Sequence, residues 1–115
     1  MLLNLSNHPS SVWDAAQLNA ARDFGGVKDL PFPAVPPEAS EGEIARLADE
    51  YCARVLATPG VSAVHLMGEM TFCFALAARL KAAGVKCVAS TTRRDVVEQD
   101  GAKTSRFSFV RFREY

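Results

Sequence analysis

The sequence predicts an α/β fold, in which a mostly parallel sheet lies between two layers of helices and ends in a C-terminal antiparallel hairpin. Strand-like and helix-like segments alternate along the chain in the order β-α-β-α-β-α-β-β. Consecutive parallel strands need crossover helices, and the intervening segments are long enough for them. The 115 residues, 49% of them apolar, suit a single domain over residues 1–115. We therefore expect a three-layer, Rossmann-like sandwich.

The first three elements follow from apolar runs and their terminators. Residues 2–5 form an apolar strand, and Ser10 or Ser11 can cap a helix over about residues 12–24. Residues 27–32 are expected to form the second strand, after which prolines favour an extended connection. The apolar residues that would form the buried stripe of this helix are Trp13, Ala16, Ala20 and Phe24.

The middle of the chain carries the clearest helix and the central strand. Ser40 and Glu43 form a capping box before a helix that ends near Pro59. Residues 61–67 are almost continuously apolar, as in a strand that is covered on both faces. Residues 71–83 form a helix that is apolar almost all round, so we expect it to be buried by the sheet or by a second copy of the chain.

The C-terminal part predicts a fourth strand and a hairpin. Residues 85–89 are strand-like, and Asp100-Gly101 supplies the positive φ angles of a tight turn between residues 95–99 and 103–112.

Composition excludes several classes of protein. The net charge is zero, but residues 1–78 carry four Lys/Arg against nine Asp/Glu, and residues 79–115 carry nine against four. This balance argues against binding of long nucleic acids and leaves room for a small anion in the C-terminal half, although the charges also suit solvated helix faces. No signal segment or membrane-spanning run is present, so we expect a cytoplasmic protein.

The cysteines and the missing motifs narrow the choice further. The three cysteines, Cys52, Cys73 and Cys87, lie in apolar stretches and lack a CxxC spacing, which is typical of reduced core residues. There is no GxGxxG, P-loop or HExxH motif and no Cys/His metal spacing. We therefore expect neither a metal site nor a cofactor.

Polar residues follow three of the expected strands directly. Because the carboxyl ends of parallel strands meet at one edge of a sheet, where such folds bind ligands, these residues are expected to converge on one crevice. They belong to the segments Ser6-Asn7-His8-Pro9, Gly68-Glu69-Met70-Thr71 and Ser90-Thr91-Thr92-Arg93-Arg94.

Each segment has a structural and a functional interpretation. His8, with Ser6 and Asn7, offers groups for phosphate binding and proton transfer, or forms only a turn. Gly68 and Thr71 suit an anion at a helix N-terminus, whereas Glu69 either contacts a ribose or adenine or only caps the helix.

The Ser90–Arg94 segment most resembles a phosphate site, because its hydroxyls and guanidiniums are charge-assisted donors; a solvated strand end is the alternative. Lys103 on the return strand can fold back over the same edge. His65 lies inside an apolar strand, where a hydrogen-bonded core histidine is the more probable interpretation.

Together the Ser-Asn-His-Pro strand end, the glycine-containing turn before a buried helix and the Thr-Thr-Arg-Arg strand end resemble the small Rossmann-like ancillary proteins of type III CRISPR systems. These are related to CARF domains, which bind cyclic oligoadenylates, and some are ring nucleases. The resemblance covers most of the chain and rests on fold order and short loops.

The resemblance implies a homodimer that binds a cyclic oligoadenylate, with cyclic tetra-adenylate favoured, and cleaves it without metal by attack of a ribose 2′-hydroxyl on the adjacent phosphorus. On this hypothesis His8 and Arg93 are the catalytic candidates. The expected ligand-binding residues are Ser6, Asn7, Gly68, Glu69, Thr71, Ser90, Thr91, Thr92, Arg94 and Lys103.

Two alternatives remain open from the sequence. One is a protein that binds the cyclic nucleotide without cleaving it. The other is a small assembly or adaptor subunit that binds no nucleotide and uses the apolar helix and the Phe-rich last strand as contact surfaces.

Overall fold

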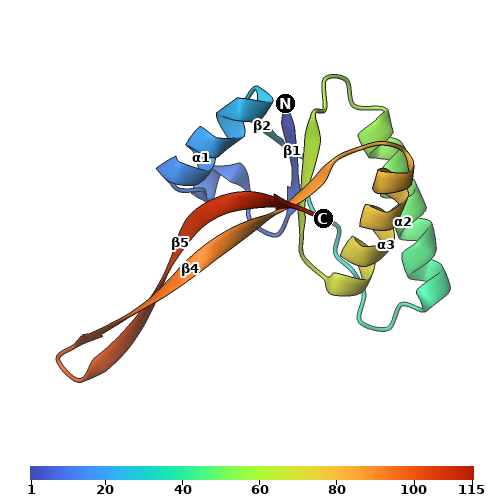
Figure 1. Ribbon diagram of the computed structural model, residues 1–115. Coiled ribbons are helices and arrows are strands. Elements are labelled where there is room, and N and C mark those ends of the chain that lie inside the picture. The colour runs from blue at the N-terminus through green and yellow to red at the C-terminus, as the bar shows by residue number, and fades with distance from the viewer.

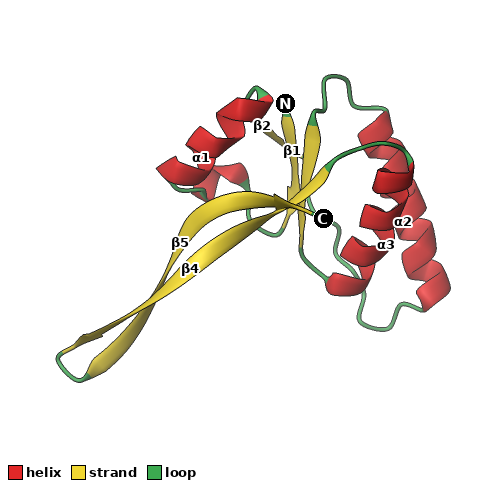
Figure 2. Ribbon diagram, viewed as in Figure 1, coloured by secondary structure: helices red, strands yellow, loops and turns green.

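A five-stranded sheet with the strand order β2-β1-β3-β4-β5 organises the protein, and the computed structural model describes all residues from 1 to 115 (Figure 1). The first four strands are parallel, and β5 runs antiparallel to β4 (Figure 2). The strands are β1 (Leu2–Ser6), β2 (Val27–Asp29), β3 (Ala63–Met67), β4 (Cys87–Gln99) and β5 (Ala102–Glu114). The expected α/β class, the mostly parallel sheet and the C-terminal antiparallel pair are confirmed.

Helices lie on both faces of the sheet. α1 (Ala15–Ala21), with short 3-10 turns over Ser10–Val12 and Arg22–Phe24, covers one face, whereas α2 (Glu41–Leu56) and α3 (Met70–Ala82) cover the other (Figure 1). Side chains alternate along each strand, so each strand contributes to both faces. No helix combines the length and the apolar character needed to cross a membrane.

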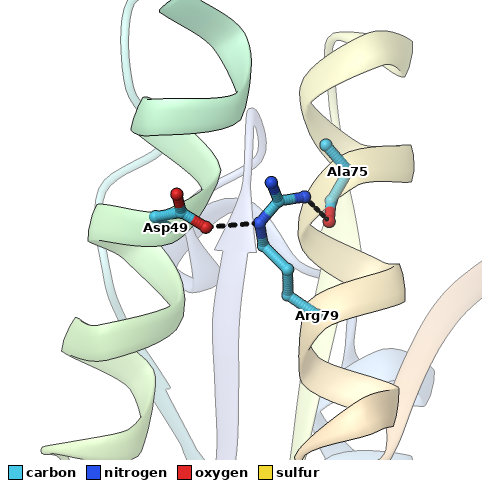
Figure 3. Close-up of polar contacts among 3 residues, drawn as sticks. All are labelled: Asp49, Ala75 and Arg79. Atoms are coloured by element: carbon cyan, nitrogen blue, oxygen red, sulfur yellow. Dashed lines mark hydrogen bonds and ion pairs between the residues drawn. The ribbon is translucent and has the colours of Figure 1, made fainter. Parts of the chain in front are cut away.

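The larger core lies between the sheet and the α2–α3 pair. Its centre is Phe72, which is fully buried, with the rings of Phe32 and Tyr51 edge-on at centroid distances of 5.3 and 5.5 Å. An ion pair joins the two helices at the surface, where Arg79 Nε lies 2.6 Å from Asp49 Oδ1 (Figure 3). Exposed ion pairs add little stability, so burial of apolar surface is what holds this face together.

The first helix is shorter than expected and begins later. Asp14, rather than Ser10 or Ser11, is the N-cap, and its carboxylate accepts a hydrogen bond from Gln17 N at 2.8 Å. Trp13 precedes the helix and is buried, but Ala16 is exposed. The prediction that Trp13 and Ala16 belong to one buried face of a helix is therefore only partly correct, because Trp13 lies before the first residue of α1.

The second strand also ends early, at Asp29 rather than at residue 32. Leu30 N still donates to Asn4 O at 2.9 Å, but Pro31 has no N–H with which to continue the ladder.

Two other expectations are confirmed, and a third is not met within one chain. The capping box of Ser40 and Glu43 is present, and β3 is the central strand. However, α3 is not buried all round, because Met70 and Phe74 are 83% and 81% exposed.

The fourth strand and the hairpin form one continuous arm. β4 runs unbroken through the residues that separated them in the sequence pattern, and it pairs with β5 along its length (Figure 1). β3 pairs with β4 only at Val64–Cys87 and His65–Val88, so the ribbon beyond has no third strand. As expected for the tight turn, Asp100 and Gly101 have φ angles of 53° and 76°.

Substituting Phe72 by alanine should lower the free energy of unfolding by about 3–5 kcal/mol, because it empties the centre of the larger core. Urea denaturation followed by circular dichroism measures the change. Phe74→Ala, in the same helix but exposed, should change it by less than about 0.5 kcal/mol. Equal effects of the two substitutions would show that the α3 faces are assigned incorrectly.

Candidate functional site

A row of polar side chains crosses the sheet on the α1 face. Asn4 on β1 is in register with Asp29 on β2 and with His65 on β3, and His65 is in register with Val88 on β4. Ser90 follows Val88 by two residues and therefore lies on the same face. Parallel pairing in this register places one polar side chain from each of four strands in a line.

Hydrogen bonds connect the row from end to end. Asn4 Nδ2 donates to Asp29 Oδ1 at 2.9 Å, and Asn4 Oδ1 lies 2.8 Å from His65 Nδ1. On the far side of the ring, His65 Nε2 lies 3.1 Å from Ser90 Oγ. The hydroxyl of Ser6 donates a further bond to Asn4 Oδ1 at 2.7 Å. Every buried polar atom of the row therefore has a partner, as native interiors require.

The His65 ring is buried and neutral. It is 1% exposed and lies edge-on to Trp13 and to Phe112, with ring centroids 5.2 and 5.5 Å away. Burial, assisted by the nearby His8, lowers the pKa of His65 from 6.5 to about 4. The interpretation as a hydrogen-bonded core histidine is correct for its contacts, but the ring also reaches the wall of a cleft.

This cleft has a volume of about 520 Å³ and lies at the carboxyl ends of β1 and β3, beside Ser90 and Thr92 of β4. Its size falls within the range of small-molecule sites. The aromatic rings of Trp13, which precedes α1, and of Phe107 and Phe109 on β5 form part of the wall. Polar side chains that include His8, Ser90 and Thr92 form another part. The lining residues are His8, Val12, Trp13, Asp14, Gln17, His65, Met67, Ser90, Thr92, Phe107 and Phe109.

The first polar strand end divides between the cleft and the supporting network. His8 is exposed and lines the cleft. The Ser6 hydroxyl is buried and accepts a hydrogen bond from His8 N at 3.2 Å, so it holds the loop in place. Asn7 is exposed and lines a separate hollow with Pro9 and Asp29. Of the three, only His8 can contact a ligand in the main cleft.

The second strand end lies outside the cleft. The carboxylate of Glu69 accepts hydrogen bonds from the hydroxyl of Thr71 at 2.7 Å, from Phe72 N at 2.7 Å and from Thr71 N at 3.1 Å. These bonds, the one from the Thr71 hydroxyl first, lower the pKa of Glu69. The space at Gly68 is filled by Phe32, whose ring would lie 2.3 Å from an added Cβ. Both the carboxylate and the helix N–H groups are thus satisfied internally, as in the capping interpretation.

The Ser90–Arg94 segment is not the strand end that the sequence predicted, because β4 continues to Gln99. The residues of the segment divide between the two faces of the arm. Ser90 and Thr92 line the cleft, and Arg94 lies on the same face, opposite Phe107. A β-bulge between Thr91 and Thr92 separates Ser90 from Thr92 and Arg94 along the arm.

Arg93 and Lys103 do not reach the cleft. Arg93 is paired with Ser108, between the positions of Phe107 and Phe109, and therefore points to the opposite face. Thr91 also leaves the site, since its hydroxyl donates to Arg111 O at 3.1 Å. Lys103 is paired with Glu98 near the tip of the arm. Only alternate residues of the Ser90–Arg94 segment therefore lie on the cleft face, and the expected convergence of all five is not found.

Four residues that build the site were not predicted from the sequence. Asn4 and Asp29 support His65, and the rings of Phe107 and Phe109 form the wall on β5. One available signal was a single polar residue inside each of two apolar strands, at Asn4 and His65. The register that unites them depends on strand order, which no local pattern shows.

The remaining reactive groups lie elsewhere. Burial raises the pKa of Cys73 to about 12 and that of Cys87 to about 11, so these thiols are poor nucleophiles at neutral pH. No three His, Cys, Asp or Glu side chains are placed to hold a metal ion.

The lowered pKa of His65 should make stability depend on pH. The unfolded chain binds a proton below about pH 6.5, whereas the folded chain does so only near pH 4, so acidification across this range favours unfolding. The loss should approach about 3 kcal/mol at pH 4 and vanish above pH 7. Urea unfolding of the wild type and of His65→Gln at several pH values measures it: the difference between their unfolding free energies should shrink on acidification. A pH-independent difference would contradict the buried neutral ring.

Comparisons with known proteins identify the family of the chain but give it no characterised relative. Neither the curated proteins nor the solved structures include a match. One family model matches residues 1–113, almost the whole chain. The chain therefore belongs to the uncharacterized protein MJ1673 family.

Proposed function

We propose that the protein binds a cyclic oligoadenylate in the cleft at the ends of β1 and β3, beside β4, and cleaves it as a ring nuclease of a CRISPR defence system. The fold would then be a Rossmann-like, CARF-like domain. The observation that supports the proposal most is the composition of the cleft, which combines aromatic rings with proton-transfer and hydrogen-bonding groups at one edge of the sheet.

The aromatic wall suits a nucleobase. Trp13, Phe107 and Phe109 line the cleft, and bases stack on such rings with a gain of about 1–3 kcal/mol each. Gln17 lies beside them, and its amide can pair with the N6 and N7 edge of adenine. This combination favours a purine nucleotide over a simple phosphosugar, which has no ring to stack.

Phosphate recognition falls to the arm. Arg94 is on the cleft face and hydrogen-bonds Ser105 Oγ at 3.1 Å, which leaves part of its fork of donors free. Thr92, two residues before Arg94 and nearer to the parallel part of the sheet, adds a hydroxyl. In the proposed reaction the 2′-oxygen attacks the adjacent phosphorus, the bond to the 5′-oxygen breaks, and a 2′,3′-cyclic phosphate remains. His8 takes part in proton transfer.

Incubation with cyclic tetra-adenylate in EDTA should yield linear products with 2′,3′-cyclic phosphate ends, separated by liquid chromatography and identified by mass spectrometry. His8→Ala should slow cleavage about 100-fold, the usual contribution of a proton-transfer group, while leaving binding nearly unchanged. Intact ligand after long incubation would rule out the enzymatic proposal. Tight binding without product, unaffected by His8→Ala, would select the non-catalytic binder.

The adjacent arginines provide a matched control. Arg94→Ala should weaken ligand binding by about tenfold or more, because a charge-assisted contact on the cleft face is lost. Arg93→Ala removes an identical charge from the opposite face of the same strand and should have a smaller effect. Calorimetric titration compares them, and the reverse order would place the phosphate on the other face of the arm.

A homodimer is part of the proposal. A two-stranded ribbon is marginally stable alone in water, yet the arm exposes Val96, Val97 and Phe107 at 56%, 48% and 64%. Pairing of two copies would cover these side chains and bring two clefts to one two-fold axis, which matches a ring of repeated nucleotides.

We expect native mass spectrometry to report two chains per bound ring. The double substitution Val96→Asp and Val97→Asp should give monomers, because it places charges in the contact. A monomer at micromolar concentration, with or without ligand, would contradict this arrangement.

The adaptor alternative has one observation in its favour. Met70 and Phe74 on α3 are largely exposed and line an apolar groove of about 370 Å³ together with Tyr115. An adaptor should co-purify with a protein that covers this groove, and Arg94→Ala should leave that association intact.

A further inference from the structure

The hydrogen bonds of Asn4 fix the orientation of its amide. Nδ2 faces two groups that can only accept, His8 O and the carboxylate of Asp29, each at 2.9 Å. Oδ1 is therefore the atom that faces Ser6 Oγ and His65 Nδ1, and it accepts from both. A flipped amide would lose both donations and direct an N–H toward the Ser6 and His65 side.

The orientation of Asn4 determines the tautomer of His65. Because Oδ1 accepts, His65 Nδ1 carries the hydrogen, and the neutral ring presents a lone pair at Nε2. The group that faces this lone pair is the hydroxyl of Ser90, at 3.1 Å. Met67 Sδ also lies 3.0 Å from Ser90 Oγ, but a thioether is a much weaker acceptor than an imidazole nitrogen. The single hydroxyl proton of Ser90 therefore points at His65.

The oxygen of Ser90 keeps its lone pairs for the cleft. Ser90 is half-buried and lines the cleft together with His65, and His8 lines the same space from the β1 end. Asn4, His65 and Ser90 thus have the relative placement of an orienting group, a base and a reactive hydroxyl. Their order along the row is set by strand order, not by their positions in the chain.

We propose that Ser90 is a catalytic residue that takes the 2′-proton of the bound nucleotide and passes its own proton to His65, while His8 protonates the leaving group. This assignment rests on the proposed function and divides the proton transfers between two sides of the cleft. Asn4 and Asp29 are positioning residues, because they act through His65.

The proton movements balance within the cleft. The 2′-hydroxyl gives its proton to Ser90 Oγ as the 2′-oxygen bonds to phosphorus, and the Ser90 proton moves to His65 Nε2. The phosphorus bond to the 5′-oxygen breaks, and that oxygen receives a proton from His8. Afterwards His65 returns its proton through Ser90 to water, and His8 is reprotonated from water.

The surroundings of His65 keep the ring neutral, with its Nε2 lone pair free. The titratable groups that line the cleft with His65 or belong to its hydrogen-bonded row are His8 on the β1 loop, Asp29 on β2 and Asp14 at the start of α1. Burial holds the pKa of His65 at about 4, so the Nε2 lone pair is available throughout the neutral range. When the ring takes a proton, the carboxylate of Asp29 faces it through Asn4 and offsets part of the charge.

Single-turnover cleavage of cyclic tetra-adenylate, with affinity measured separately, tests the role of Ser90. Ser90→Ala should lower the rate constant at least about 100-fold and change the dissociation constant less than about threefold. Ser90→Thr keeps a hydroxyl on the same carbon and should recover most of the rate. Ser108→Ala removes a hydroxyl from the opposite face of the arm and should behave like the wild type.

A double substitution tests the connection to His65. If Ser90 and His65 carry one proton in sequence, Ser90→Ala combined with His65→Gln should be no slower than the slower single variant. Multiplying effects would overturn the link to His65.

The outcomes separate this inference from the function on which it rests. Cleavage by the wild type with an unchanged rate in Ser90→Ala would overturn the role of Ser90 and leave the proposed function standing. Absence of cleavage by the wild type would overturn both. A Ser90→Ala variant that loses binding as much as rate would assign Ser90 to ligand binding instead of proton transfer.

Discussion

The hydrogen-bonded row from Asp29 through Asn4 and His65 to Ser90 is the constraint on which the rest of the structure depends. It buries Asn4 and His65 in the middle of a parallel sheet, where an unpaired donor or acceptor would cost about 1–3 kcal/mol. The row is satisfied only if the four strands keep their register, because a slip of one residue would turn each side chain to the opposite face. The polar network therefore specifies strand alignment as well as a site.

The two faces of the sheet differ in the side chains they bury because the polar row lies on only one of them. The α2–α3 face holds a continuous apolar core around Phe72 and carries most of the buried surface. The α1 face has a smaller apolar cluster around Leu2 and Trp13, and beyond it the polar row opens into the cleft. Trp13 serves both parts, since its ring covers His65 and its Nε1 donates to His8 O at 3.0 Å. The larger apolar core and the candidate cleft thus lie on opposite faces of the sheet.

The arm extends the sheet beyond its parallel part and completes the cleft wall. The bulge at Thr91–Thr92 shifts the pairing of β5 with β4, so that Phe107 and Phe109 lie on the same face of the arm as Thr92. Both rings therefore reach the cleft. Arg93 and Arg94 lie on opposite faces of the arm because side chains alternate along β4. Two neighbouring arginines that look equivalent in the sequence therefore have different surroundings.

Local pattern determined the element types, the capping box at Ser40, the Asp100-Gly101 turn and the meeting of polar groups at one edge of the sheet, since these depend on neighbouring residues and on the direction of parallel strands. His8, Ser90 and Thr92 were predicted at the site on that ground and line the cleft. Tertiary structure alone decided that Glu69 caps a helix, that Arg93 faces away, and that Asn4 and His65 join Ser90. These outcomes depend on register, on the bulge and on strand order, which arise from contacts between residues up to 61 positions apart.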